Sequence, residues 1–206
     1  MLNLTGRPAV MVKAPFDTAI TEICRKRPEV VVLSADLALY TDLFTVPREL
    51  PGQFVQVGVA EQNLMGVAGG LAKSGCIPVA TTFAVYAVRR AYDHMVISMG
   101  TGPSRGVVVG FLPGILNPLR VHHQTLEDVA KLRSVPGACI IDPMDATELI
   151  DAVHASIDHP SLVYIRAERG MVPKLLNRGE TAFAIGRVYP LRSEGDGAVS
   201  CRRQKL

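Results

Sequence analysis

The chain has 206 residues, a formal net charge of +3 and 48% hydrophobic residues. This length and composition suit one α/β domain with a substantial core, and the small charge argues against a nucleic-acid or anionic-membrane surface. No apolar run is long enough to cross a bilayer, and the N-terminus lacks the apolar stretch of a signal peptide. The cysteines form no C-x-x-C pair, which predicts reduced thiols in a cytoplasmic protein. They are Cys24, Cys76, Cys139 and Cys201.

The first half of the chain alternates between helix-like and strand-like patterns. Residues 1–13 are expected to be a lead-in, and Pro15 is typical of the first turn of a helix. The β-branched run 30–33 is typical of a strand buried on both faces. The predicted elements are helix 15–27, strand 30–33, a loop with a short helical piece at 40–51, strand 54–59, helix 61–74, strand 77–81 and helix 84–99.

The second half continues this alternation and then loosens after residue 170. The predicted elements are strand 106–111, an irregular loop at 112–121, helix 124–133, strand 138–141, helix 145–157 and strand 162–166. Residues 183–191 are interpreted as one more strand or a linker, and residues 193–206 as a frayed tail. The whole pattern predicts an α/β fold with a doubly wound, mainly parallel sheet and helices on both faces.

The stretch 58–66 (Gly-Val-Ala-Glu-Gln-Asn-Leu-Met-Gly) places Glu61 where a predicted strand gives way to a helix. Ligands of open α/β sheets collect at such junctions, although a Glu in a first helical turn is also favoured by the helix dipole. Gly66, Gly69 and Gly70 lie near one helical face and predict another backbone packed closely against it. A carboxylate beside such an interface can be desolvated, which raises its pKa and suits it to proton chemistry.

Four motifs in order give the chain a family resemblance: V-x-x-A-E-Q-N, T-F-x-x-Y with R-R-A-Y-D, H-Q-T-L-E-D, and V-Y-I-R. Together they resemble the pyrimidine-binding domain of transketolases, which use thiamine diphosphate. The resemblance covers roughly residues 14–172. It implies a lead-in at 1–13, a pyrimidine-binding domain at 14–172, and a linker and tail at 173–206, with the family's C-terminal domain absent.

The resemblance assigns cofactor contacts to three residues. Glu61 matches the glutamate that hydrogen-bonds the pyrimidine ring nitrogen and favours the activated form of the cofactor. Tyr86 matches the residue that stacks on the aminopyrimidine, and Phe83 lines the pocket beside it. Without the resemblance, Phe83 and Tyr86 would be interpreted as core aromatics.

Further positions carry weaker matches. Arg89 stands where many transketolases have a Tyr near the pyrimidine amino group. A cofactor contact from Arg89 is expected by position, although the residue type differs from that of the family. Asp36 matches an aspartate near the cofactor, with a helix-capping or loop role as the alternative. His123 matches the histidine that faces cofactor and substrate and can shuttle protons. Its alternative is a loop histidine that caps the following helix.

Arg166 ends the V-Y-I-R motif and matches the arginine that holds a sugar phosphate, a task suited to its planar guanidinium. The neighbouring histidines His122 and His123 make a poor metal pair, because successive side chains diverge, and no metal site is predicted. The family binds the diphosphate and Mg²⁺ through a G-D-G…N motif on another domain, and this complete motif does not occur here, because no Asn follows the G-D-G triplet at 195–197. The resemblance therefore implies a partner subunit that holds the diphosphate and Mg²⁺, in a dimer or heterotetramer.

The leading hypothesis is the pyrimidine-domain subunit of a split transketolase, active with its partner and transferring a two-carbon ketol unit between sugars or sugar phosphates. One alternative is a subunit of a decarboxylating relative, similar to 1-deoxyxylulose-5-phosphate synthase or to the beta subunit of 2-oxoacid dehydrogenases. Another is a non-catalytic paralogue that only binds a partner. Nucleic-acid and membrane partners are not expected.

Overall fold

The structure is a computed structural model that describes residues 8–101, 105–115, 121–175, 183–187 and 204–205. The main sheet consists of β2 (Val30–Ser34), β3 (Phe54–Gln56), β4 (Ile77–Phe83), β5 (Gly106–Phe111), β6 (Cys139–Ile141), β7 (Leu162–Ala167) and β9 (Gln204–Lys205). Its strand order is β3-β2-β4-β5-β7-β6-β9. All neighbours pair in parallel except β6 and β9, which are antiparallel.

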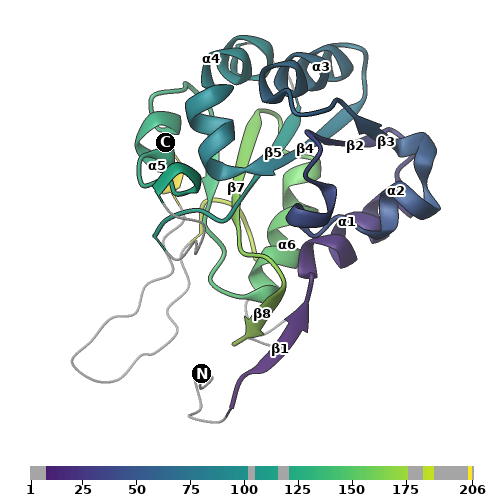
Figure 1. The fold of residues 1–206 in the computed structure, drawn as a ribbon, viewed down its shortest axis with the longest axis vertical. Helices are drawn as coiled ribbons and strands as arrows, with labels where there is room; N and C mark the ends of the chain where they lie inside the picture. The colour runs from purple at the N-terminus through teal and green to yellow at the C-terminus, as the bar shows by residue number, and fades with distance from the viewer. Residues whose placement is uncertain (1–7, 102–104, 116–120, 176–182, 188–203, 206) are drawn as a thin grey trace.

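Helices cover both faces of this sheet (Figure 1). They are α1 (Pro15–Lys26), α2 (Thr45–Glu49), α3 (Glu61–Lys73), α4 (Tyr92–Met95), α5 (Asp128–Leu132) and α6 (Ala146–Ile157). One apolar cluster joins α1 and α6 to the sheet, and a second joins α3, α4 and α5 to the opposite face. The predicted doubly wound α/β fold is confirmed. None of the described helices is both long and apolar enough to span a membrane.

Local sequence explains the best-formed elements. The side chain of Asp145 accepts a hydrogen bond from the Glu148 amide at 2.7 Å, and Glu148 in turn accepts one from the Met144 amide at 2.8 Å. This reciprocal arrangement is a capping box, and it fixes the start of α6. The alternate side chains of β2 enter the two apolar clusters, as expected for a strand covered on both faces.

Several predicted elements differ from the structure. The predicted helix 84–99 is broken into a π-helical turn (Tyr86–Arg90), α4 and a second π-helical turn (Val96–Gly100), and the strand predicted at 77–81 continues to Phe83. Helix 124–133 shortens to α5, and strand 54–59 ends at Gln56 before Gly58, whose φ is 75°. Three 3₁₀ turns complete the described helices: Ala38–Thr41, Pro51–Gln53 and Val121–His123.

The two ends of the domain also differ from the prediction. Residues of the predicted lead-in form β1 (Val10–Lys13), which pairs antiparallel with β8 (Met171–Lys174) to make a separate ribbon. The predicted tail is not frayed throughout, because Gln204 and Lys205 pair with β6. Residues 183–187 form no strand and pack Phe183 and Ile185 on the α1/α6 cluster. Residues 188–203, with Cys201, lie outside the described residues.

The glycines of α3 have two different environments. A Cβ on Gly69 would lie 2.5 Å from the Ser98 Cβ and 2.6 Å from the Ser98 carbonyl oxygen, so this glycine allows α3 to pack on the second π-helical turn. A Cβ on Gly66 or Gly70 would meet nothing within 4 Å. The close backbone approach predicted for this face of α3 therefore occurs at Gly69, where the neighbouring backbone is that of Ser98 in the same chain.

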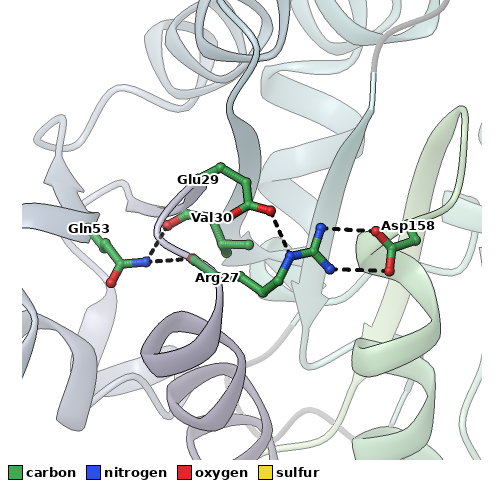
Figure 2. A network of polar contacts seen from close by, with 5 residues as sticks. All are labelled: Arg27, Glu29, Val30, Gln53 and Asp158. Atoms are coloured by element: carbon green, nitrogen blue, oxygen red, sulfur yellow. Dashed lines mark hydrogen bonds and ion pairs between the residues drawn. The ribbon is translucent and has the colours of Figure 1, made fainter.

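A polar cluster around Arg27 lies at the edge of the sheet where the parallel strands begin, which we call the amino edge (Figure 2). Arg27 donates from Nη1 and Nη2 to Asp158 at 3.2 and 3.0 Å, and from Nε to Glu29 at 2.6 Å. Gln53 donates to the carbonyl oxygens of Arg27 and Val30, each at 2.9 Å. The hydrogen bond from Arg27 lowers the pKa of both carboxyl groups. The cluster joins the ends of α1 and α6 to the start of β2.

Candidate active site

The predicted site residues gather at the opposite edge of the sheet, the carboxyl edge. Asp36 follows β2, Glu61 begins α3 after β3, Phe83 ends β4, and Arg166 is the penultimate residue of β7. Because parallel strands all end at the same edge, residues far apart in the sequence become neighbours there. This is the expected place for a site in an open α/β sheet.

Glu61 is almost fully buried at the first position of α3, with 1% of its surface exposed. Arg90 donates from Nη1 to both carboxylate oxygens of Glu61, at 2.9 and 2.8 Å. The same guanidinium lies 4.3 Å from the centre of the Tyr86 ring. A buried carboxylate needs such a cationic partner. The flat guanidinium of Arg90 thus contacts both the Glu61 carboxylate and the Tyr86 ring.

Three rings form a wall beside this pair. Phe83 and Tyr86 stack with centroids 5.9 Å apart and an interplanar angle of 20°. His123 meets both edge-on, at 5.9 Å from Phe83 and 5.7 Å from Tyr86. The structure thus brings the predicted stacking residue, the predicted pocket residue and the predicted histidine together.

Arg89 points to a different partner from its neighbour. Its guanidinium is in bidentate contact with Glu127, with Nη2 donating to Oε2 at 3.0 Å. The hydrogen bond from Arg89 lowers the pKa of Glu127 to about 2. The guanidinium of Arg89 is therefore already engaged with Glu127, and its predicted contact with a cofactor stays a prediction.

Asp36 lies exposed at the end of β2 in a left-handed conformation, with φ of 60°. Its amide donates to the side chain of Gln56 at 2.7 Å. The following 3₁₀ turn is capped instead by Ser34, which accepts from the Leu37 amide at 3.2 Å. The side chain of Asp36 therefore does not cap this turn, which is consistent with the loop alternative, and its cofactor contact stays a prediction.

Arg166 lies in a partly buried polar cluster, in which Asp128 is buried and Asp142 is exposed. It donates from Nε to Asp128 at 2.9 Å and from Nη1 to Asp142 at 2.6 Å. Tyr164 donates to the same oxygen of Asp128 at 3.2 Å, and burial followed by the charge of Asp128 raises the pKa of Tyr164. Burial alone would lower the pKa of Arg166, but the two aspartates outweigh it and the pKa is raised.

A cavity of about 360 Å³ lies beside Arg166. Its walls are mainly apolar and come from the segments around Met144 and β8, with Glu168 and Arg169 among the charged residues. Burial raises the pKa of Glu168. Of the predicted site residues only Arg166 reaches this cavity, so it is distinct from the wall formed by Phe83, Tyr86 and His123.

Sequence reasoning missed Arg90, Glu127 and Asp128. Arg90 follows Tyr86 by four residues, a helical spacing that places both on one face, and this signal was available. Glu127 and Asp128 stand in the quoted H-Q-T-L-E-D motif, but no pattern connects them to Arg89 or Arg166. Among the described residues, no group of three or more His, Cys, Asp or Glu side chains is arranged to hold a metal.

The fold and this edge define an α/β domain in which a buried glutamate lies beside an aromatic wall. The family model described as the transketolase pyrimidine-binding domain matches residues 9–174, and the chain belongs to this family.

Three similar proteins illustrate the family. The uncharacterised transketolase family protein y4mN of Sinorhizobium fredii is 42% identical over 186 residues, which cover 90% of this chain and 54% of that protein. The 6-deoxy-6-sulfo-D-fructose transketolase subunit SqwH of a Clostridium species is 33% identical, covering 87% and 56%. The structure of a split gene transketolase, an inactive β4 tetramer, matches with a TM-score of 0.79 and 32% identity, covering 90% and 60%. The chain thus spans little more than half the length of these proteins.

Proposed function

We propose that the chain is the pyrimidine-domain subunit of a thiamine diphosphate-dependent transketolase-like enzyme that transfers a two-carbon ketol unit between sugars or sugar phosphates. The observation that carries this proposal is the buried Glu61 beside the Tyr86 ring. The flat guanidinium of Arg90 makes a stacking contact with that ring and donates hydrogen bonds to that carboxylate. These are the two kinds of contact that a pyrimidine ring would need, so the residues fit the cofactor.

Each residue then has a role in the reaction. When bound, thiamine diphosphate supplies the carbon centre that carries the two-carbon unit. Glu61 holds a hydrogen bond at the pyrimidine ring nitrogen in exchange for its contact with Arg90. Tyr86 orients the ring by stacking, and Phe83 lines the pocket beside it. His123 moves a proton at a substrate hydroxyl. Arg166 binds the anionic end of a sugar phosphate with the part of its guanidinium not engaged by the aspartates.

Asp36 and Arg89 are proposed as further contacts at the rim of the cofactor site. Arg89 would have to exchange its Glu127 contact for such a role. The diphosphate and Mg²⁺ would be held by a second subunit in a cytoplasmic dimer or heterotetramer. The relation to a transketolase named as a subunit and to a split transketolase supports this division of labour. Residues 14–172 would form the pyrimidine-binding domain, with 173–206 as linker and tail.

The first test measures thiamine diphosphate and Mg²⁺ binding by calorimetry, with and without the product of the neighbouring gene. We expect binding with the partner and about a fivefold loss of affinity in Tyr86→Ala, because a stacking contact is worth about 1 kcal/mol. Tyr40→Ala is the matched control, since Tyr40 is exposed and contacts Arg169 rather than the ring wall. Equal losses in both variants would contradict the proposed site.

A second test addresses the reaction. Glu61→Gln should abolish cofactor-dependent turnover in the assembled enzyme, because the amide cannot exchange a proton with the pyrimidine. Turnover that needs pyruvate and releases CO₂ would instead identify a decarboxylating relative. Binding of the partner without any turnover on ketose donors would favour the non-catalytic alternative.

A further inference from the structure

The segment 121–127, which carries His123, is fastened to the protein at its C-terminal end. Two adjacent acidic residues close it, and each binds an arginine from a different element. Glu127 binds Arg89 of the first π-helical turn, and Asp128 binds Arg166 of β7. The segment is thereby tied both to the helical layer and to the sheet.

Glu127 is the centre of the first attachment. Its carboxylate receives the bidentate contact from Arg89, a hydrogen bond from the Leu126 amide at 3.1 Å and one from the Thr125 hydroxyl at 3.2 Å. One side chain therefore orders its own segment and binds the opposite element at the same time. Bidentate contacts between arginine and carboxylate fix orientation as well as distance.

Asp128 makes the second attachment from inside the protein. It is fully buried, and one of its oxygens accepts from both Arg166 and Tyr164. Its other oxygen is buried without a hydrogen-bond partner among the described residues. A buried carboxylate at this position is costly to leave without a cation, so its contact with Arg166 is needed to hold the segment in place.

The spacing of these residues connects the attachment to the ring wall. Arg89 lies three residues after Tyr86, and Glu127 lies four residues after His123. The pair between Arg89 and Glu127 thus joins the two backbones that carry the Tyr86 and His123 rings, whose centroids are 5.7 Å apart. A second contact, from Lys131 Nζ to the Val88 carbonyl at 2.9 Å, joins the same two elements.

We propose that Glu127, held by Arg89 and backed by Asp128, is a positioning residue that keeps His123 against the Tyr86 ring. This inference deepens the proposed function and rests on the role of His123 in it. In this arrangement Arg89 acts through Glu127, and the rim contact proposed for Arg89 above would require this pair to break.

Hydrogen–deuterium exchange of the chain alone tests the attachment. Glu127→Gln removes the charge and should speed amide exchange in residues 121–126 about threefold to tenfold, and Arg89→Lys should give a smaller increase. Glu49→Gln is the matched control. Glu49 binds Arg25 at 2.7 Å, and this ion pair is exposed to a similar degree as the pair of Arg89 and Glu127. It joins α1 to α2 and lies away from the ring wall. Unchanged exchange at 121–126 in both Glu127→Gln and Arg89→Lys would overturn the proposal.

A double-mutant cycle tests the connection to His123 in the assembled enzyme. Glu127→Gln should lower kcat about tenfold with KM nearly unchanged, and this effect should vanish in a His123→Ala background. A loss of kcat that persists without His123 would overturn the positioning role. Full activity in His123→Ala alone would overturn the proposed role of His123 and the inference with it. The exchange data would still report the attachment independently, and cofactor binding would still report the site of Glu61 and Tyr86.

Discussion

The two edges of the sheet each place one arginine between two carboxylates, and they differ in burial. At the amino edge, Arg27 and Asp158 have side chains 33% and 67% exposed. At the carboxyl edge, Arg166 and Asp128 have side chains 17% and 1% exposed. Exposed ion pairs add little stability, whereas buried charges are costly to create and costly to separate. The ion pairs of the amino edge therefore join their elements with little desolvation cost. At the carboxyl edge the buried Asp128 carboxylate carries a large desolvation cost, at a place where the proposed site needs a fixed geometry.

The largest expected difference between the edges comes from removing each arginine. Arg166→Met leaves the buried Asp128 without its cation and should lower the free energy of unfolding by about 3–5 kcal/mol. Arg27→Met should cost much less, because its ion pairs face solvent. Urea unfolding of both variants measures the difference. Stability should return in Arg166→Met combined with Asp128→Leu, and equal losses in the two single variants would refute the comparison.

A second difference is expected at the two ends of β5. A Cβ on Gly110 would lie 2.3 Å from the Tyr164 hydroxyl oxygen, and one on Gly106 would lie 2.4 Å from the terminal methyl of Met99. Met99 can move, but Tyr164 is buried and bonded to Asp128. Gly110→Ala should therefore cost about 1–3 kcal/mol and Gly106→Ala less. Tyr164→Phe should recover part of the Gly110→Ala loss, and no recovery would contradict this explanation.

A third, smaller effect concerns pH. The folded-state pKa of Glu127 is lowered from 4.5 to about 2 by the hydrogen bond from Arg89. The contribution of this pair is therefore fully present above about pH 4.5 and is lost as the pH falls toward 2. The stability difference between wild type and Glu127→Gln, measured by urea unfolding, should stay constant from pH 7 to pH 5 and shrink from pH 4.5 to pH 3. A difference that grows on acidification would contradict the assignment.

The smallest effect is one of reactivity. Cys76 lines a cavity at the amino edge with Arg27, Glu29 and Arg105, whereas burial raises the pKa of the Cys24 thiol to about 12. Maleimide should label Cys76 at least tenfold faster than Cys24 in the folded chain, with equal rates in urea. Because the proposed site lies at the other edge, labelled protein should bind the cofactor as before. Faster labelling of Cys24 would mean that the α1 face opens more readily than its burial suggests.

The sequence predicted the fold where the signal is local. The β-branched run of β2 and the spacing of α6 gave correct elements, because one-dimensional patterns report burial directly. The broken helix after Phe83 was missed, since a π-helical turn adds a residue that leaves the apolar spacing nearly unchanged. The ribbon was missed because its strands lie far apart in the chain and Pro173 interrupts the strand pattern of β8.

The candidate site was predictable in its residue types and less so in its contacts. Glu61, Phe83, Tyr86 and His123 were chosen from motifs, and the structure brings their elements to one edge. Which of the two adjacent arginines meets Glu61 depends on the turn geometry after Phe83, and the sequence does not reveal that geometry. Asp128 was missed because its partners, Tyr164 and Arg166, come from β7, more than 30 residues later.

The ribbon of β1 and β8 has a mechanical consequence. Val10 pairs with Lys174, and Lys13 pairs with Met171, so the chain enters and leaves this ribbon side by side at the same end. A pull on residues 10 and 174 would load its hydrogen bonds one after another, as in a zipper. The parallel strands of the main sheet lie beyond the ribbon in this path. Tension applied at these two residues would therefore open the ribbon first and reach the strands that precede Glu61 and Tyr86 only afterwards.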